Sequence, residues 1–429
     1  MLFDEVLAAG PVRAHVSDTA WLQAMLDAEA ALACAQADVG LVDQAVAEDI
    51  VAACVASRYD VAELATAAAA SGNPAAPLAR ALAERVPPEA RPFVHRGATS
   101  QDIVDTAAML VSRRAVSAVL VDLWACCDDL GTLCAEHRDT LQVGRTLLQQ
   151  ALPTTFGLTV AGWLSGLGAA GRSLAGLRPA AQLGGAVGTL ASLDPSGPAV
   201  LAAYARRLGL REPDVPWHTD RGRIADLAGV LGRVCGCVAK VAGDVVLLAQ
   251  TEVGELTETA EGAGGSSTLP HKRNPVAAVS ARAAAARAPG LVATLLASAA
   301  QEHQRAAGAW HAEWGPLAEL LRVTGSAVWW LRTSVSRLTV HPERMRENLA
   351  RTGGAVLAER VAAELARPGA HDEVAECVRA GGDLVERLAG LGLDRERVVE
   401  LLDPAGYLGA AGEFVDRALA AHARRKDGR

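Results

Sequence analysis

Residues 224–255 read IADLAGVLGRVCGCVAKVAGDVVLLAQTEVGE. Apolar side chains recur at three- and four-residue spacing on more than one face of this stretch, which is typical of a helix with neighbours all round it. The stretch lies in a proline-free segment of 53 residues, Trp217 to Leu269, and a second one of 60 residues runs from Phe93 to Leu152. Because runs of alternating β-branched or aromatic residues are scarce, we expect an all-α protein built on long helices.

Clusters of proline interrupt the helical pattern and predict where helices end. These clusters are Pro74/Pro77, Pro87/Pro88/Pro92, Pro195/Pro198 and Pro213/Pro216. We divide the chain into an N-terminal helical domain (residues 1–105), a central long-helix bundle domain (106–340) and a C-terminal helical domain (341–429).

One uncharged window could be mistaken for a membrane span, because Thr146 to Gly171 holds 26 residues without a charge. It contains Gln149, Gln150 and Pro153, and much of its apolar content is Ala and Gly rather than Leu or Ile. We therefore expect a helix buried in a large bundle there, and no association with a membrane.

Composition and charge limit the classes of function that this chain can have. With 429 residues, 51% of them hydrophobic, the chain can bury a large core, and its net charge of −8 offers no basic field for nucleic acid. The eight cysteines form no CxxC pair, and no basic, apolar leader begins the chain. We expect a cytoplasmic protein with reduced thiols that acts on a small molecule.

Three stretches do not have the pattern of ordinary core. In His95-Arg96-Gly97-Ala98-Thr99-Ser100-Gln101-Asp102, Thr99 and Asp102 have the spacing of a capping box, although a helix start with these donors would also bind a carboxylate. The glutamines of Gly144–Gln150 either bond neighbouring helices or bind a ligand.

The third stretch, Gly262 to Pro275, reads GAGGSSTLPHKRNP. A flexible linker would explain the glycines and serines but not the ordered Lys, Arg, Asn and two prolines, so a donor-rich flap over a site is favoured. It lacks the GxxxxGK[ST] order of a phosphate loop, and neither a zinc signature nor a GxGxxG after a strand is present elsewhere. We expect no metal and no cofactor.

Together these stretches resemble the fumarase/aspartase superfamily, whose signature GSSxMPxKxNP is matched by Gly265–Pro275 with Leu269 in place of Met. Residues 95–102 match its HxGxTSxD element, and Thr146 with Gln149 matches its TxxQ element. Four further stretches are most similar to the 3-carboxy-cis,cis-muconate cycloisomerases of that superfamily: GRTLLQQALPTTFG (144–157), QLGGAVGTLASL (182–193), PWHTDR (216–221) and GAWHAEW (308–314).

The resemblance implies a three-domain helical fold with a central five-helix bundle, and a homotetramer whose sites are each shared between subunits. It implies a polycarboxylate substrate, an aci-carboxylate intermediate and lactone formation in the breakdown of aromatic compounds through β-ketoadipate. The implied catalytic residues are Ser266, Lys272, Asn274 and His95, with Ser266 as the proton-transfer residue. The implied substrate-binding residues are Thr99, Ser100, Arg96, Arg145, Thr146, Gln149, Ser267 and His271, and Arg221 and Arg305 are further candidates for a third carboxylate.

One departure from the family pattern bears on the substrate. Amine-eliminating members have Thr-His where this chain has Thr146-Leu147, and general acid assistance to a leaving nitrogen is worth about 10²–10⁴ in rate. A carboxylate leaves or attacks without a proton, so Leu147 fits a lactonising enzyme. His95, His303 or His311 would weaken this inference if one of them supplied the proton.

Two alternatives remain open. A lyase that expels another stable anion, such as nitrite from a nitrosuccinate, has no need of the missing acid either, whereas adenylosuccinate is less favoured. A structural protein on this fold, as some crystallins are, is disfavoured by the intact set of Ser266, Lys272 and Asn274.

Overall fold

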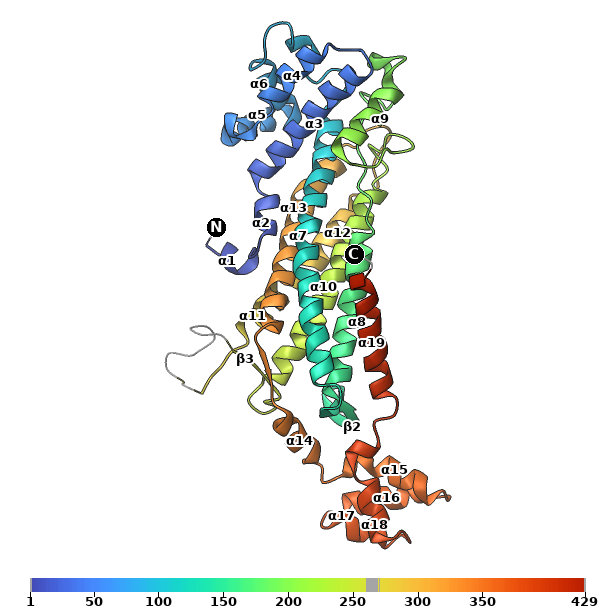
Figure 1. Ribbon diagram of the computed structural model, residues 1–429. Coiled ribbons are helices and arrows are strands. Elements are labelled where there is room, and N and C mark those ends of the chain that lie inside the picture. The colour runs from blue at the N-terminus through green and yellow to red at the C-terminus, as the bar shows by residue number, and fades with distance from the viewer. Residues whose placement is uncertain (1, 260–268, 270, 428–429) are drawn as a thin grey trace. The chain divides into compact units, whose positions relative to one another are not determined.

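The structure is a computed structural model that describes residues 2–259, 269 and 271–427 (Figure 1). Helices make up most of the described chain, and the strands there form two small antiparallel sheets, β1-β2 and β3-β4. The predicted all-α class is confirmed. The strands are β1 (Leu141–Thr146), β2 (Gln149–Thr155), β3 (Leu256–Glu258) and β4 (Leu338–Val340).

Nineteen α-helices occur in the described residues, several of them short. They are α1 (Asp4–Leu7), α2 (Val12–His15), α3 (Asp18–Asp38), α4 (Gln44–Ala53), α5 (Val61–Ser71), α6 (Ala75–Ala83), α7 (Ser100–Glu136), α8 (Phe156–Ala175), α9 (Gly197–Leu208), α10 (Gly222–Leu248), α11 (Val276–Ala285), α12 (Ala288–Ala297), α13 (Ala309–Val335), α14 (Pro342–Ala350), α15 (Ala358–Leu365), α16 (Ala370–Arg379), α17 (Leu384–Ala389), α18 (Arg395–Leu401) and α19 (Ala411–Asp427).

The two proline-free segments hold the long helices α7 and α10, as the sequence predicted. By internal contacts the chain divides into two compact units. The first unit consists of residues 1–122, 170–236 and 283–330, and the second of residues 123–169, 237–282 and 331–429.

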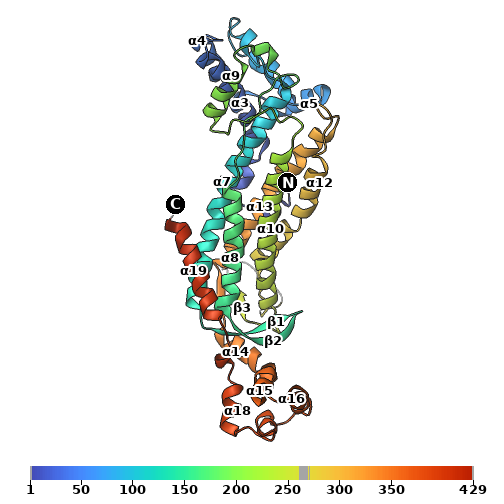
Figure 2. The ribbon, with the colours of Figure 1, turned by 90° about the vertical axis from the view of Figure 1, so that its right-hand side faces the viewer.

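In the first unit, α3 packs against α4 and α9, and its start is capped by Ser17, whose hydroxyl accepts a hydrogen bond from the N–H of Ala20 (3.2 Å). The parts of α7, α10 and α13 in this unit lie side by side (Figures 1 and 2). Gly325 of α13 allows close packing, because a Cβ there would come within 2.5 Å of Val12.

In the second unit, a hairpin of β1 and β2 precedes α8, and β1 packs against α14 (Figure 2). Helix α8 is joined to α10 by a hydrogen bond from Trp163 Nε1 to Asp244 Oδ2 (2.7 Å). The short helices α15 to α18 enclose a separate small core that includes Val361, Val374 and Leu388.

The helix expected over Thr146 to Gly171 is wrong in its first ten residues, which belong to the hairpin. Pro153 lacks the N–H that a helix interior needs, whereas it is tolerated in this two-stranded sheet. Thr155 then starts α8, because its hydroxyl accepts a hydrogen bond from the N–H of Leu158 (3.1 Å).

The uncharged window therefore contains a hairpin followed by a helix. None of the helices in the described part of the chain is long and apolar enough to cross a membrane. All eight cysteines are free thiols, five of them buried and three partly buried. Burial raises the pKa of Cys134 and of Cys235 to about 11, so these thiols stay protonated at neutral pH.

Candidate active site

Asp102, in the first turn of α7, is fully buried and joins three segments of the first unit. Its Oδ2 accepts hydrogen bonds from the N–H groups of Thr99 and Gly185 (both 2.9 Å), and its Oδ1 accepts one from Gly184 N–H (3.0 Å). His218 Nε2 lies 2.7 Å from the same Oδ1. A carboxylate oxygen accepts hydrogen bonds, so Nε2 is the donor in this contact.

The capping interpretation of residues 95–102 is half confirmed. The Asp102 carboxylate reaches back to the N–H of Thr99, as in a capping box. In the other direction, the N–H of Asp102 bonds the main-chain carbonyl of Thr99 (2.9 Å). Ser100, the first residue of α7, and Thr99 are both partly buried beside this carboxylate.

Close packing of backbone surrounds Asp102. A Cβ on Gly97, whose φ is +83°, would come within 2.5 Å of Leu193, and one on Gly184 would come within 2.8 Å of Cε1 of His218. Only glycine therefore lets the chain at residue 97 approach Leu193, and the chain at residue 184 approach His218, so closely.

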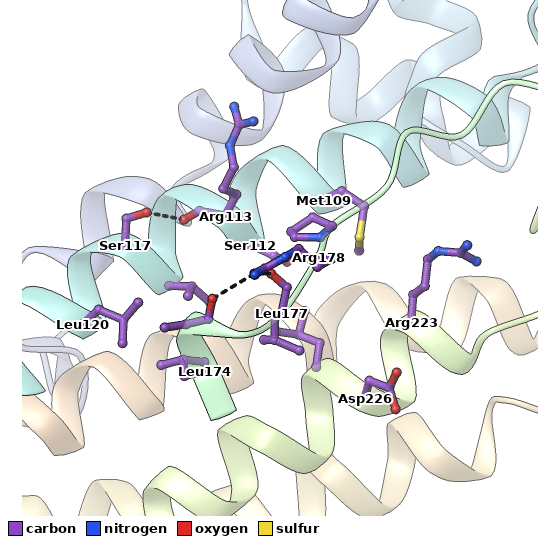
Figure 3. Close-up of a pocket in the computed structure, with 14 residues that line it drawn as sticks. Met109, Ser112, Arg113, Ser117, Leu120, Leu174, Leu177, Arg178, Arg223 and Asp226 are labelled. Carbon is purple, nitrogen blue, oxygen red and sulfur yellow. Dashed lines mark hydrogen bonds between the residues drawn. The ribbon is translucent and has the colours of Figure 1, made fainter. Parts of the chain in front are cut away.

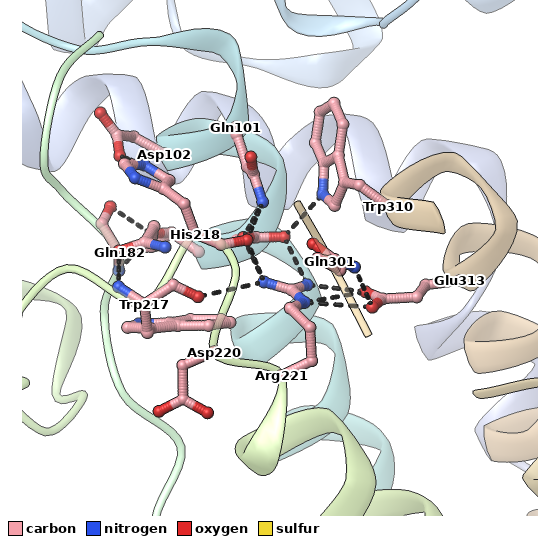
Figure 4. A network of polar contacts seen from close by, with 12 residues as sticks. Gln101, Asp102, Gln182, Trp217, His218, Asp220, Arg221, Gln301, Trp310 and Glu313 are labelled. Atoms are coloured by element: carbon pink, nitrogen blue, oxygen red, sulfur yellow. Dashed lines mark hydrogen bonds and ion pairs between the residues drawn. The ribbon is translucent and has the colours of Figure 1, made fainter. Parts of the chain in front are cut away.

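A buried ion-pair network lies beside this group, and Figure 4 shows its side chains converging on Arg221. Arg221 binds both oxygens of Asp105 (2.8 and 3.0 Å) and also binds Glu313 (2.7 Å). Asp105 accepts two further hydrogen bonds, from Gln101 (3.0 Å) and Trp310 (3.0 Å). The charge of Arg221 is thus matched by two carboxylates inside the protein, which is a structural arrangement rather than a free anion site.

Burial raises the pKa of the Glu313 carboxyl, although Arg221 partly opposes this. The partners of Arg221 come from α7 and α13, so the network ties the loop before α10 to both helices. Removing the guanidinium would leave two carboxylates buried without a cation.

His95 lies just before α7 with φ of +58°, an uncommon conformation for a residue with a Cβ. Its Nδ1 is 2.6 Å from Oε1 of Glu29, a buried residue of α3. Burial by itself would lower the pKa of His95, but the charge of Glu29 and its hydrogen bond, with a smaller contribution from Asp102, raise it above 6.5. The pair with Glu29 thus stabilises the imidazolium form relative to an isolated histidine, and one ring nitrogen is already held.

Two of the four arginines considered for a third carboxylate carry no ion pair within the described residues: Arg96 and Arg305. Arg96 Nη1 donates to the carbonyl of Leu41 (3.3 Å). Arg305 donates to Gln101 Oε1 (2.9 Å) and to the carbonyl of Ala186 (2.7 Å), on the turn that also binds Asp102. Neutral partners leave their positive charge available to an anion.

The other two histidines that were considered as acids have main-chain contacts in this unit. The carbonyl of His303 accepts a hydrogen bond from the hydroxyl of Thr219 (2.9 Å), and His311 Nε2 lies 2.9 Å from the carbonyl of Gly72. His303 has φ of +45°, so its position in the loop is strained as that of His95 is.

The second group of predicted residues lies in the second unit, at the tip of the β1-β2 hairpin. Thr146 pairs with Gln149 as the last pair of the ladder, and both side chains are exposed. Leu147 and Leu148 form the two-residue loop with φ of +51° and +65°. A residue with a Cβ in this region is strained by on the order of 1 kcal/mol.

The base of the hairpin is fixed by Glu255, which is fully buried. Arg145 binds it through two nitrogens (2.5 and 3.1 Å), and Gln142 (2.9 Å) and Asn348 (2.8 Å) donate to it as well. On the other strand, Gln150 donates to the carbonyl of Asn348 (2.9 Å). Arg145, a predicted substrate-binding residue, therefore has a carboxylate partner of its own.

The third group follows β3. Ser266 and Ser267 lie outside the described residues. His271 and Lys272 are exposed, the N–H of Lys272 bonds the carbonyl of Leu269 (3.0 Å), and Asn274 is partly buried just before α11.

Glu258, the last residue of β3, ties the two ends of this segment together. Its carboxylate accepts hydrogen bonds from the N–H groups of Ala277 (2.8 Å) and Ala278 (3.1 Å) in the first turn of α11. The hydroxyl of Ser334 donates to it at 2.6 Å. The chain thus leaves β3 and begins α11 at the same carboxylate. The negative charge of this carboxylate is also stabilised by the positive end of the α11 helix dipole.

A cavity of about 200 Å³ in the first unit has a different character (Figure 3). Its lining is largely apolar and includes the carboxylate of Asp226. Arg113 donates to two carbonyls at the end of α9, and Arg178 donates to two carbonyls of its own loop. Arg223 lies over the ring of Trp217, 5.4 Å from its centroid. We therefore do not assign a carboxylate site there.

The predicted site residues are thus distributed over both units. His95, Arg96, Thr99 and Ser100 belong to the first unit, and Arg145, Thr146, Gln149, His271, Lys272 and Asn274 belong to the second. Among the described residues, no group of three or more His, Cys, Asp or Glu side chains is placed to hold a metal ion.

Several residues around the site were not among the predicted ones. Glu29, Glu255 and Glu258 carried no sequence signal, because each is an isolated acid in helical or strand-like text. His218 lies in the family-like stretch PWHTDR, and Asp102 closes the HxGxTSxD element, so their motifs could have indicated them.

Comparison with known proteins supports one family assignment. The family model described as lyase matches residues 6–290. A 3-carboxy-cis,cis-muconate cycloisomerase of Pseudomonas aeruginosa is 46% identical, with 98% of this chain and 96% of the relative covered. A nitrosuccinate lyase of Streptomyces davaonensis is 43% identical, with 97% and 94% covered.

Among solved structures, a 3-carboxy-cis,cis-muconate lactonizing enzyme from Pseudomonas putida superposes with a TM-score of 0.93 at 42% identity, with 99% of both chains covered. The match therefore extends over the whole fold as well as the sequence. The chain belongs to the lyase family of the fumarase/aspartase superfamily, and it is an enzyme of the lyase and cycloisomerase type.

Proposed function

We propose that the protein converts 3-carboxy-cis,cis-muconate to a carboxymuconolactone. The observation that carries this proposal is Leu147, which stands at the hairpin tip where amine-eliminating relatives have a histidine. Leu147 offers no proton to a leaving nitrogen, and lactone formation needs none, because a carboxylate oxygen is the nucleophile. The cycloisomerase of P. aeruginosa supports the same substrate class.

The reaction is an internal addition in which no atom is lost. One carboxylate oxygen of the substrate bonds to the alkene carbon β to a second carboxylate, and the π electrons move into that carboxylate to form the aci-carboxylate. We assign Ser266 as the group that then delivers a proton to the α carbon, which leaves the lactone. Lys272 and Asn274 are the donors for the charge that develops, and losing one such donor typically lowers the rate about 10²–10³-fold.

Substrate binding is assigned to hydroxyl, amide and imidazole groups of the three motifs. Thr99 and Ser100 at the start of α7 hold one carboxylate, and Thr146, Gln149, Ser267 and His271 complete the site in this proposal. For the third carboxylate we favour Arg96 and Arg305, because Arg221 and Arg145 are already paired with carboxylates of the protein. His95, the remaining catalytic residue of this proposal, lies just before α7 with its Nδ1 held by Glu29.

The runner-up activity is elimination of nitrite from a nitrosuccinate. It is favoured by the S. davaonensis relative, and nitrite also leaves without a proton. The same Ser266 would then remove the α proton rather than deliver it, with Lys272 and Asn274 stabilising the same kind of intermediate.

We further propose a homotetramer with shared sites, built from the three predicted domains. Exposed apolar side chains on α11 and α12 support an interface, namely Val276 (40% exposed), Val279 (50%) and Leu296 (51%). Light scattering should give a mass near four times 44.3 kDa. An active monomer would contradict both the assembly and the shared sites.

A substrate panel tests the activity. The purified protein, without added metal or cofactor, should remove the conjugated-diene absorbance of 3-carboxy-cis,cis-muconate and give a lactone by chromatography. Argininosuccinate and adenylosuccinate should be inert, because their leaving nitrogens need an acid. A preference for nitrosuccinate would move the assignment to the runner-up, and a preference for adenylosuccinate would overturn the leaving-group argument.

A further inference from the structure

The tip of the β1-β2 hairpin combines two unfavourable features. Thr146 and Gln149 are the last paired residues, so Leu147 and Leu148 alone make the turn, with φ of +51° and +65°. Positive φ at both central positions defines a type I′ turn, for which Asn-Gly is the preferred sequence. Two leucines in these positions are strained, because their Cβ atoms crowd the backbone.

Packing within the described chain covers little of either leucine side chain. The side chain of Leu147 is 95% exposed and that of Leu148 is 69% exposed. Ordinary surface turns are polar and contain glycine, so a strained and exposed apolar pair has no folding advantage. Backbone strain of this kind persists mainly where function requires it.

The tip is held firmly despite its exposure. On β1, Arg145 and Gln142 both bind the buried carboxylate of Glu255, and on β2 Gln150 donates to the carbonyl of Asn348. The two strands are thus anchored on different partners. Arg145 on β1 and Gln150 on β2 each lie two residues from the strained turn. The leucines are presented in a fixed position rather than on a flexible loop.

The order of side chains along the tip indicates what they contact. Thr146 and Gln149 are hydrogen-bonding residues on either side of the two leucines. A polar, apolar, apolar, polar order is complementary to a molecule with carboxylates separated by a hydrocarbon chain. A substrate with a charged amine in the chain would instead be desolvated against the leucines without a partner.

We infer that Leu147 and Leu148 form an apolar wall against the unsaturated hydrocarbon chain of the substrate and select polycarboxylates in which that chain carries no amine. The inference rests on the proposed function. It goes beyond the missing general acid, because it assigns the two leucines a contact that binds substrate. It also explains why the turn keeps leucine where Asn-Gly would fold with less strain.

The test replaces the two leucines with Asn-Gly, the sequence that a type I′ turn prefers. The double variant Leu147→Asn with Leu148→Gly should raise KM for 3-carboxy-cis,cis-muconate at least about tenfold, the usual loss when an apolar contact with substrate is removed. Its melting temperature should stay the same or rise, and its mass by light scattering should not change. Leu147→Met with Leu148→Met, which keeps an apolar wall, should stay within about threefold of the parent KM, because Met adapts to apolar contacts.

Ala366→Gly provides a matched control. Ala366 follows α15 with φ of +47° and is exposed, so glycine relieves the same kind of strain far along the chain from the hairpin. It should raise the melting temperature without changing KM or kcat. Strain relief alone is thereby separated from loss of the leucines.

Each outcome decides between the interpretations. An unchanged KM in the Asn-Gly variant overturns the wall, and so does a loss of assembly in that variant, which would make the leucines a subunit contact. If the unmodified protein does not turn over carboxymuconate at all, the proposed function itself is wrong. This result is obtained before any variant is compared.

Discussion

His218 Nε2 lies 2.7 Å from Oδ1 of Asp102, and the two oxygens of that carboxylate also accept three main-chain N–H groups. One buried side chain thereby fixes the start of α7, the turn at Gly184 and Gly185, and the loop that carries His218. The positions of Thr99 and Ser100, which we assign to substrate binding, depend on this arrangement.

Asp102→Asn should destabilise the protein and lower its activity. The amide keeps only one acceptor oxygen and turns N–H groups toward donors, so buried N–H groups lose their partners, at about 1–3 kcal/mol for each unsatisfied group. Urea unfolding measures the loss. Asp226→Asn, at an exposed carboxylate of α10, is the control and should change little. Equal stability of the two variants would contradict the role of Asp102.

The His95–Glu29 pair should make stability depend on pH. The folded-state pKa of His95 is raised above 6.5, so the contribution of the pair is fully present below 6.5 and is lost as the pH rises through the folded pKa. The difference in unfolding free energy between the parent and His95→Gln should therefore shrink as the pH increases above 6.5. A difference that grows over that range would show that the imidazolium is not the stabilised form.

Ser266→Ala should abolish turnover while substrate still binds. The change removes the proposed proton-transfer oxygen but keeps Thr99, Ser100, Lys272 and Asn274 as carboxylate donors. Calorimetry gives the affinity, and absorbance gives the rate. A fall in rate of less than about tenfold, well below the usual contribution of general acid-base catalysis, would exclude Ser266 from that role.

Glu258→Gln should lower kcat more than it raises KM. Gln has one acceptor oxygen for the N–H groups of Ala277 and Ala278, so the start of α11 shifts and moves Lys272 and Asn274 with it. Misplacement of catalytic groups by about 1 Å costs on the order of 10² in rate.

The control for this variant is Glu343→Gln, at an exposed glutamate of α14 that pairs only with Arg346 among the described residues. It should leave both constants unchanged. Rescue of the position by Glu258→Asp, which retains a carboxylate, would be partial because the side chain is shorter. Parent-like kcat in Glu258→Gln would show that the carboxylate does not position the segment.

The sequence predicted the parts of this fold that depend on local pattern. The proline-free segments correspond to α7 and α10, because spacing of apolar residues and the absence of proline are local properties. The β1-β2 hairpin was missed for the same reason. Its uncharged residues resemble a buried helix, and its turn uses two leucines rather than the Asn-Gly that would have indicated a hairpin.

The partners of the site residues depend on contacts distant in sequence. Glu29 lies 66 positions before His95, and Glu255 lies 110 positions after Arg145. Motifs identified His95 and Arg145, but spacing along the chain could not show that each already has a carboxylate partner. Arg221 differs most from its predicted role. It is paired with the carboxylates of Asp105 and Glu313, so it belongs to the buried core and not to a binding site for substrate.

The carboxylate of Glu258 has a consequence for exchanging parts between relatives. Since β3 ends and α11 begins at one side chain, Glu258 holds both elements that flank the segment between them. A graft of residues 259–275 from the nitrosuccinate lyase, joined at Glu258 and Val276, would leave β3, β4 and α11 in place. The reactions of two family members could then be compared on one scaffold by exchanging this whole segment instead of single residues.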